Sequence, residues 1–197
     1  QIVFIILGSL QFSEAALRVY GHPQLLEIAA QINGEDFAPF NETLFIKEPG
    51  RGAAVSWHQD GTTHWDSPDF DEGIHGFNFM AQVYGSDPVN GVWVVPGTHK
   101  QGKVDIRRLV EESGSERLKD AVPLVCDAGD VVICNRQLVH GSFPNTGELF
   151  ALFRVFPVFA APPDQPGTVP ASSLRIVGSG SWHFPRPPEI AIRSVKL

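Results

Sequence analysis

The sequence has few cysteines, little positive charge and no long apolar run, and each shortage excludes a class of protein. Cys126 and Cys134 are the two cysteines among 197 residues. Both lie in a valine-rich stretch, where a small buried thiol is the expected state, and free thiols fit a reducing cytoplasm. Fifteen basic residues against 22 acidic ones give a net charge of −7. This balance argues against nucleic acid or an anionic membrane as the main partner.

The apolar run at residues 2–7 (IVFIIL) is too short to cross a membrane and has no basic flank. We expect it to form a buried strand, and we expect a cytoplasmic protein with no membrane partner. Hydrophobic residues make up 43% and charged residues 19% of the chain, which is an ordinary globular composition. The length suits one domain.

Helical periodicity is confined to two regions. Residues 13–34 (SEAALRVYGHPQLLEIAAQING) predict two short helices broken at Gly21-His22-Pro23, with Ser13 as N-cap and Gly34 as C-cap. Residues 104–120 predict a polar, partly helical excursion on the surface.

Short apolar runs separated by glycine, proline, asparagine and aspartate fill residues 39–160. Such a series of strands predicts an all-β sandwich or barrel. Half of the 16 prolines lie beyond residue 156, so we expect an extended tail that wraps the barrel. Residues 1–197 are therefore expected to form a single domain, with an N-terminal strand and helices (1–38), a barrel core (39–160) and a proline-rich extension (161–197).

The segment SWHQDGTTHWD, residues 56–66, contains one pattern twice: His58-x-Asp60 and His64-x-Asp66. Side chains two apart on a strand share a face, so either pair could offer a nitrogen and a carboxylate to one metal ion. The pattern alone is a weak signal, and a third ligand would strengthen it. His140 in LVHGSFPN is a candidate, although a hydrogen-bonded structural histidine is the alternative. Two histidines and a carboxylate suit non-haem Fe(II) oxygenases, and they also suit Zn(II).

Arg154 lies in LFALFRVF, a strand that is otherwise apolar on both faces. A buried arginine needs an anionic partner, because an unpaired buried charge costs several kcal/mol. The partner could be the carboxylate of a small dicarboxylic cosubstrate, which a guanidinium grips with two hydrogen bonds. An internal salt bridge to Glu42 or Glu48 is the alternative.

Four segments together resemble the phytanoyl-CoA dioxygenase family of Fe(II)- and 2-oxoglutarate-dependent oxygenases. They are SWHQDG, NGVWVVPGTHKQG, AGDVVICNRQLVHGSFPN and LFRVF, and they occur in the family's order between residues 44 and 156. The resemblance implies a mainly β fold, the double-stranded β-helix, also called a jelly roll or cupin barrel, with the N-terminal helices packed outside.

Site residues follow from the resemblance position by position. It makes three residues the iron ligands: His58, Asp60 and His140. It places His64 and Asp66 in a loop on the substrate side. Ser142 of the HGS motif and Arg154 would hold the carboxylate of 2-oxoglutarate. Gln59 and Trp93 stand at positions that line the cosubstrate and substrate cavity in relatives, and Lys47 lies on the strand that leads to the metal. The resemblance makes all three candidates for cofactor binding.

One position departs from the family. Relatives often place the cosubstrate arginine about eleven residues after the second histidine, where this chain has Ala151. Arg154 is the favoured replacement. If Arg154 has a different role, another cation such as Lys47 or Arg51 has to bind the cosubstrate, or that binding is lost.

The implied activity is a dioxygenase reaction with Fe(II), 2-oxoglutarate and O2. It would hydroxylate an unactivated C–H bond of a small or moderately apolar metabolite and release succinate and CO2. Two alternatives stay open: a non-catalytic cupin-type protein that binds a metal or ligand, and a zinc-dependent hydrolase on the same barrel. The expected partner is a small-molecule substrate, and neither its identity nor the oligomeric state follows from the sequence.

Overall fold

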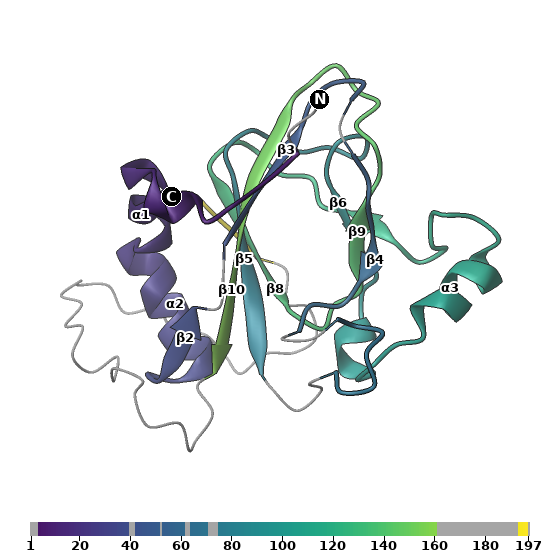
Figure 1. Ribbon diagram of the computed structural model, residues 1–197, viewed down its shortest axis with the longest axis horizontal. Coiled ribbons are helices and arrows are strands. Elements are labelled where there is room, and N and C mark those ends of the chain that lie inside the picture. Colours follow the sequence, from purple (N-terminus) through teal and green to yellow (C-terminus); the bar gives the residue numbers. More distant parts are fainter. Residues whose placement is uncertain are drawn as a thin grey trace.

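Two antiparallel β-sheets face each other in the computed structural model, which describes residues 4–39, 42–51, 53–61, 64–70, 75–160 and 193–196. The major sheet has the order β1-β3-β10-β5-β8-β11, with β2 beside β10, and the minor sheet has the order β4-β9-β6-β7 (Figure 1). The major sheet consists of β1 (Ile5–Leu7), β2 (Phe37–Pro39), β3 (Thr43–Lys47), β5 (Gly76–Gln82), β8 (Asp130–Asn135), β10 (Ala151–Ala160) and β11 (Arg193–Lys196). The minor sheet consists of β4 (Val55–His58), β6 (Val92–Val94), β7 (Val122–Pro123) and β9 (His140–Ser142). The predicted jelly roll is confirmed.

Two helices cover the outer face of the major sheet, as the periodicity predicts. They are α1 (Glu14–Tyr20) and α2 (Pro23–Asn33), preceded by a short 3-10 turn, η1 (Ser9–Gln11). The Ser13 hydroxyl caps α1 by accepting a hydrogen bond from the Ala16 amide, and Gly34 ends α2 with a φ of 86°. Leu25 and Ala29 of α2 pack against residues of β5 and β8. No helix of the described residues is long and apolar enough to cross a bilayer.

The segment between β6 and β7 lies on the opposite side of the molecule, against the outer face of the minor sheet (Figure 1). It contains η2 (Thr98–Lys100) and α3 (Ile106–Ser113), whose N-cap is Asp105. The predicted polar excursion is thus confirmed as partly helical. Its apolar residues form one cluster with side chains of β4 and β6: Trp57, Trp93, Val95, Val104, Ile106, Leu118 and Val139.

A second apolar cluster fills the space between the sheets. It consists of Met80, Val92, Val94, Leu124, Cys126, Val132, Cys134, Leu138 and Phe153. Both cysteines are buried and free, as expected. Every residue of β5 is buried, because α2 covers one face of this central strand and the other face points into the barrel.

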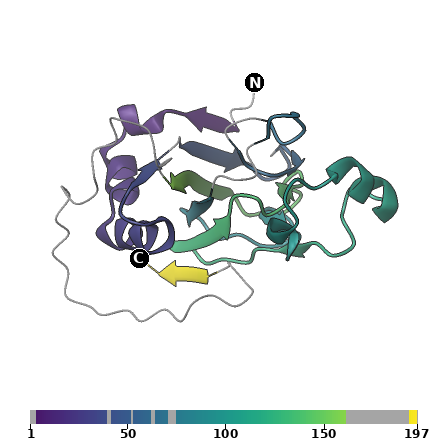
Figure 2. The ribbon, with the colours of Figure 1, turned by 90° about the horizontal axis from the view of Figure 1, so that it is seen from below.

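The two ends of the described chain lie at opposite edges of the major sheet (Figure 2). The prediction of a buried strand near the start is wrong in one respect: β1 is a strand, but Ile5, Ile6 and Leu7 are 37%, 37% and 68% exposed. An edge strand has a neighbour on one side only, and β1 pairs with β3 alone among the described strands. Residues 161–192 of the predicted tail lie outside the described residues, and β11 pairs with β8.

Candidate functional site

Two histidines face each other across the pairing of β4 with β9. His58 ends β4 and His140 begins β9, and the two residues are directly opposite in the antiparallel register. Their ring centroids are 4.2 Å apart. Gly141 permits this close approach, because a Cβ at this position would lie 2.9 Å from the Val55 carbonyl oxygen.

The register of β4 shifts between Val55 and His58. Strict alternation would place these two residues, three apart, on opposite faces, yet both line the same cavity. A bulge of this kind re-aims side chains and is common next to active sites. It turns the imidazole of His58 into the barrel.

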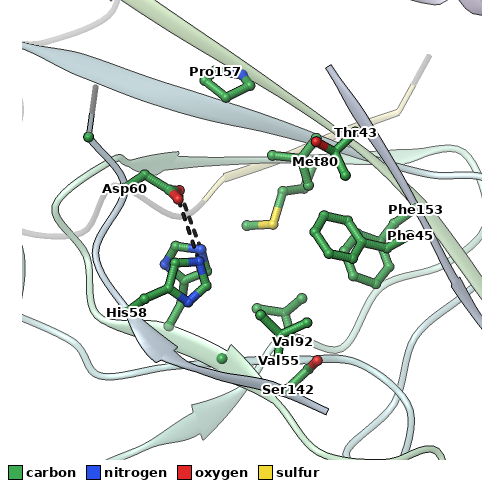
Figure 3. Close-up of a pocket in the computed structure, with 14 residues that line it drawn as sticks. Thr43, Phe45, Val55, His58, Asp60, Met80, Val92, Ser142, Phe153 and Pro157 are labelled. Atoms are coloured by element: carbon green, nitrogen blue, oxygen red, sulfur yellow. Dashed lines mark ion pairs between the residues drawn. The ribbon is translucent and has the colours of Figure 1, made fainter. Parts of the chain in front are cut away.

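Asp60 joins His58 and His140 in a group of three side chains of the kinds that bind metal ions, which we call the triad (Figure 3). Its Oδ1 lies 3.5 Å from Nε2 of His58, and its Oδ2 lies 3.4 Å from Nε2 of His140. One ligand atom from each residue lies within 4.8 Å of the others. Among the described residues, this is the one group of three or more histidine, cysteine or acidic side chains close enough to bind a single ion.

Hydrogen bonds fix how the two imidazoles present their nitrogens. Nδ1 of His58 lies 2.7 Å from the Ser56 carbonyl oxygen, and Nδ1 of His140 lies 2.8 Å from that of Leu138. A carbonyl oxygen only accepts, so each Nδ1 carries a proton, and Nε2 is the nitrogen that each ring directs towards Asp60. Metal-binding histidines are oriented in this way by the partner of their other nitrogen.

Electrostatics keep the Asp60 carboxylate ionised. Burial raises its pKa, but the charge of His140 and the hydrogen bond from His58 outweigh that effect, and the pKa falls far below its usual range. Asn78 of β5 also donates a hydrogen bond to Oδ2. Burial lowers the pKa of His140, and the nearby charge of His58 lowers it further. Burial lowers the pKa of His58 as well, but its hydrogen bond to Asp60 outweighs that effect and the pKa is raised overall. A metal ion requires an ionised carboxylate and neutral imidazoles as ligands, so its binding would release the proton that His58 shares with Asp60.

A cavity of about 150 Å³ adjoins the triad. Most of its wall is apolar and comes from both sheets: Phe45, Val55, Met80, Val92, Phe153, Val155 and Pro157. The rings of Phe45 and Phe153 stack with centroids 5.2 Å apart, and the Met80 thioether extends into the space between them and the triad (Figure 3). The protein thus places a charged site against a largely apolar wall.

Ser142 brings a hydroxyl to this wall. Its Oγ is buried and has no hydrogen-bond partner within the described part of the chain. A buried polar atom without a partner costs about 1–3 kcal/mol, so its presence here points to a ligand atom or water that satisfies it.

Lys47 is a buried cation at the end of β3. Its side chain is 2% exposed, and Nζ donates a hydrogen bond to the carbonyl oxygen of Phe143, the residue after Ser142. Burial lowers the pKa of Lys47 to about 8. In the sheet, Lys47 lies opposite Ala151, the position at which relatives often have arginine. The cation of Lys47 thus lies next to the position at which relatives often have the cosubstrate arginine.

Gln59, which the resemblance places at a cavity position, is not among the residues that line the described cavity. Its Nε2 donates to the carbonyl oxygens of Gly102 and Gln137, at 2.9 and 2.7 Å, and its Oε1 accepts from the Val104 amide. Gln59 lies between two residues that face the barrel, so its side chain takes the outer side of the strand. It ties the ligand strand to the excursion between β6 and β7.

Trp93 is likewise directed away from the cavity. Its neighbours Val92 and Val94 point into the barrel, so alternation places the indole on the outer face of the minor sheet. There the guanidinium carbon of Arg117 lies 4.3 Å from the centroid of the Trp93 ring, and the indole nitrogen donates a hydrogen bond to the Pro88 carbonyl oxygen. Its contribution is to packing of that outer layer.

The side chain of Arg154 lies outside the described residues. Its backbone belongs to β10, where it pairs with Leu44 and Ala81, and its neighbours Phe153 and Val155 both line the cavity. The acid suggested as an internal partner, Glu42, accepts hydrogen bonds from the Ser9 hydroxyl and the Leu10 amide.

The second copy of the pattern lies apart from the triad. Asp66 forms an ion pair with Arg107 of α3, and the amide of Asp66 donates to Nδ1 of His64. The structure therefore brings His140 together with His58 and Asp60, the first copy of the pattern.

Two residues that the sequence analysis did not single out also contact Asp60: Asn78 and Arg136. Each is a polar residue within an apolar run, GFNFMAQ and VVICNRQLV, and each is fully buried. Such a residue is a signal for a buried polar network, because its burial is costly without partners.

Comparison with known proteins agrees with this geometry. Residues 9–150 match the family described as phytanoyl-CoA dioxygenase (PhyH). The protein "Phytanoyl-CoA dioxygenase 1" of Oryza sativa subsp. japonica is 32% identical over 115 residues, which are 53% of this chain and 38% of that protein. The chain thus spans well under half the length of the curated relatives it matches.

Solved structures share the fold. EvdMO1 superposes with a TM-score of 0.64 at 28% identity, covering 82% of this chain and 36% of EvdMO1. AviO1 from Streptomyces viridochromogenes Tue57 superposes with a TM-score of 0.63 at 25% identity, covering 84% of this chain and 70% of AviO1. The likeness extends over most of the barrel.

Replacing Gly141 with alanine tests the dependence of the site on the close pairing of β4 and β9. The added methyl group would meet the Val55 carbonyl oxygen and the Trp57 backbone, so β4 has to move away from β9. We expect a loss of about 1–3 kcal/mol in the free energy of unfolding and weaker binding of divalent metal. Denaturant unfolding and a Mn(II) titration measure the two effects. Unchanged metal affinity in Gly141→Ala would show that the spacing of these strands does not control the site.

Proposed function

The chain belongs to the phytanoyl-CoA dioxygenase family, and on this basis we propose that it is an Fe(II)- and 2-oxoglutarate-dependent dioxygenase. In this proposal it hydroxylates an unactivated C–H bond of a small or moderately apolar metabolite with O2 and releases succinate and CO2. The observation that carries the proposal is the convergence of His58, Asp60 and His140 on one point of the barrel interior.

The residues present fit an Fe(II) ion. Two imidazoles that direct Nε2 towards one ionised carboxylate supply the donor set of non-haem Fe(II) oxygenases, which leaves positions open for other ligands. Bound there, Fe(II) supplies the activation of O2 that is coupled to oxidative decarboxylation of 2-oxoglutarate.

The protein's own contribution is to hold and shield the reactants. Asn78 keeps the Asp60 carboxylate turned towards the histidines. The apolar wall around Met80 and the stacked pair Phe45 and Phe153 would limit the contact of water with bound reactants. Exclusion of water strengthens the electrostatic interactions inside and protects reactive species from side reactions.

Lys47 and Ser142 are our proposed anchors for the distal carboxylate of 2-oxoglutarate. The Ser142 hydroxyl is buried without a partner, and the Lys47 ammonium is bound to the carbonyl oxygen of the adjacent residue, Phe143. A buried ammonium favours an anionic partner because burial alone destabilises its charged form. Arg154 stays a candidate for the same carboxylate, since its side chain lies outside the described residues. Of the two other cations named from the sequence, Lys47 is buried and Arg51 is exposed.

Turnover of 2-oxoglutarate tests the proposed function. With Fe(II), ascorbate and 2-oxoglutarate, the wild-type protein is expected to form succinate slowly even without its primary substrate. His140→Ala should lower the rate to background, because it removes one metal ligand. His64→Ala is the matched control, since His64 belongs to the other copy of the pattern and should leave the rate unchanged.

The rival functions give different results in the same assay. Metal binding without succinate formation under any condition would support a non-catalytic cupin. Hydrolysis that requires zinc and no oxoacid would support the zinc-dependent hydrolase.

Binding of 2-oxoglutarate to the Mn(II)-loaded protein tests the role of Lys47. Lys47→Met should weaken binding about 10-fold or more, because loss of one partner of a buried charge pair costs about 2–5 kcal/mol. Lys47→Arg should restore part of the affinity. Lys103→Met is the control, since its exposed Nζ donates to the Ser67 carbonyl oxygen. Titration calorimetry measures all four proteins.

The pH dependence of this binding has a definite sign. The ammonium form binds the carboxylate, and the Lys47 pKa in the free protein is about 8. Affinity should therefore fall as the pH rises above 8 in the wild type and stay level in Lys47→Arg. A Lys47→Met protein with wild-type affinity would rule out this anchor.

A further inference from the structure

Arg136 lies in the turn between β8 and β9 and is not among the residues that line the cavity beside the triad. We propose that Arg136 is a positioning residue that holds Asp60 in the geometry for metal binding. The inference rests on the proposed metal site, and it adds a residue to which neither the motif nor the composition assigns a role.

The burial of Arg136 is the first reason. Its side chain is 0% exposed and is one of the largest fully buried side chains of the described residues. A guanidinium in the interior is tolerated only where hydrogen bonds and charge contacts compensate for lost hydration. Such a costly residue indicates that its contacts serve a specific arrangement.

Its contacts with Asp60 are the second reason. The Asp60 amide donates to the Arg136 carbonyl oxygen at 2.9 Å, and Nη1 of Arg136 donates to the Asp60 carbonyl oxygen at 2.6 Å. These two bonds run in opposite directions and hold the peptide groups on both sides of the Asp60 Cα. They fix the direction in which the carboxylate leaves the backbone.

Asp60 needs this support because it lies beyond the sheet. The β4 strand ends at His58, and His58 is the last residue of β4 in register with β9. The backbone of Asp60 therefore has no strand neighbour in the described ladder, and Arg136 supplies the donor and the acceptor that a neighbouring strand would otherwise provide.

Arg136 is itself fixed from two directions. Its amide donates to the Gly76 carbonyl oxygen at 3.1 Å, where β5 begins. Its guanidinium carbon lies 5.5 Å from the ring centroid of buried Phe70, within the range of a cation–π contact. Since Asn78 of β5 bonds the Asp60 carboxylate, β5 and Arg136 together hold both the side chain and the main chain of this one ligand.

Metal titration of purified variants separates positioning from simple stability. Arg136→Met keeps much of the apolar stem and removes the guanidinium, and Arg136→Lys keeps the charge. We expect Arg136→Met to weaken Mn(II) binding about 10- to 100-fold, the range found when residues that orient metal ligands are replaced. Arg136→Lys should fall between Arg136→Met and the wild type. Calorimetric Kd values for Mn(II) are the readout.

Arg117→Met is the matched control. Its guanidinium also stacks on aromatic rings, those of Trp93 and Phe143, but on the outer face of the minor sheet. It should bind Mn(II) as the wild type does. Thermal unfolding of every variant in EDTA measures the stability of the metal-free protein. A purely structural role would lower that stability and leave the Kd of the folded protein unchanged.

The outcomes distinguish this inference from the proposed function. Wild-type protein that binds no Mn(II) overturns the metal site and this inference with it. Wild-type binding together with an equal Kd in Arg136→Met overturns the inference alone. If Arg136→Met does not fold, Arg136→Lys and Phe70→Leu carry the test, and an unchanged Kd in both overturns the inference.

Discussion

The antiparallel pairing of β4 with β9 is the constraint on which the site depends. It places His58 directly opposite His140 and tolerates no side chain at Gly141. A bulge in β4 then turns His58 into the barrel, and Asp60 follows two residues later. Ligands far apart in sequence thus meet because a backbone register brings them together. Since slippage by one residue would turn one imidazole out of the barrel, the register and the metal site depend on the same contact.

Three ionisable residues in and beside the barrel are largely removed from solvent. Asp60, Lys47 and Arg136 are ionisable residues set among apolar side chains, and a well-packed apolar core would be the more stable choice at such positions. Their cost is offset by specific partners: Asn78 for the carboxylate, and the carbonyl oxygens of Phe143 and Asp60 for the two cations. Local departures of this kind from the rules of core packing are expected where a protein has a functional site.

The sequence predicted what depends on local pattern. The two N-terminal helices followed from apolar spacing and the caps Ser13 and Gly34, and the jelly roll followed from the resemblance. Gln59 and Trp93 are not among the residues that line the described cavity, because a family position fixes a place along the strand, whereas the bulge and the alternation of side chains decide the face. The exposure of β1 depends on its place at the sheet edge. Arg136 escaped notice because its partner is the backbone of a residue 76 positions away, which no local pattern reveals.

The central claim is that one Fe(II) ion binds to three side chains brought together by this register. Anomalous diffraction at the iron absorption edge, from crystals loaded anaerobically with Fe(II), tests it most directly. The account predicts a single strong peak within bonding distance of Nε2 of His58, Nε2 of His140 and a carboxylate oxygen of Asp60. A peak at His64 and Asp66, or no peak between the three predicted ligands, would contradict it.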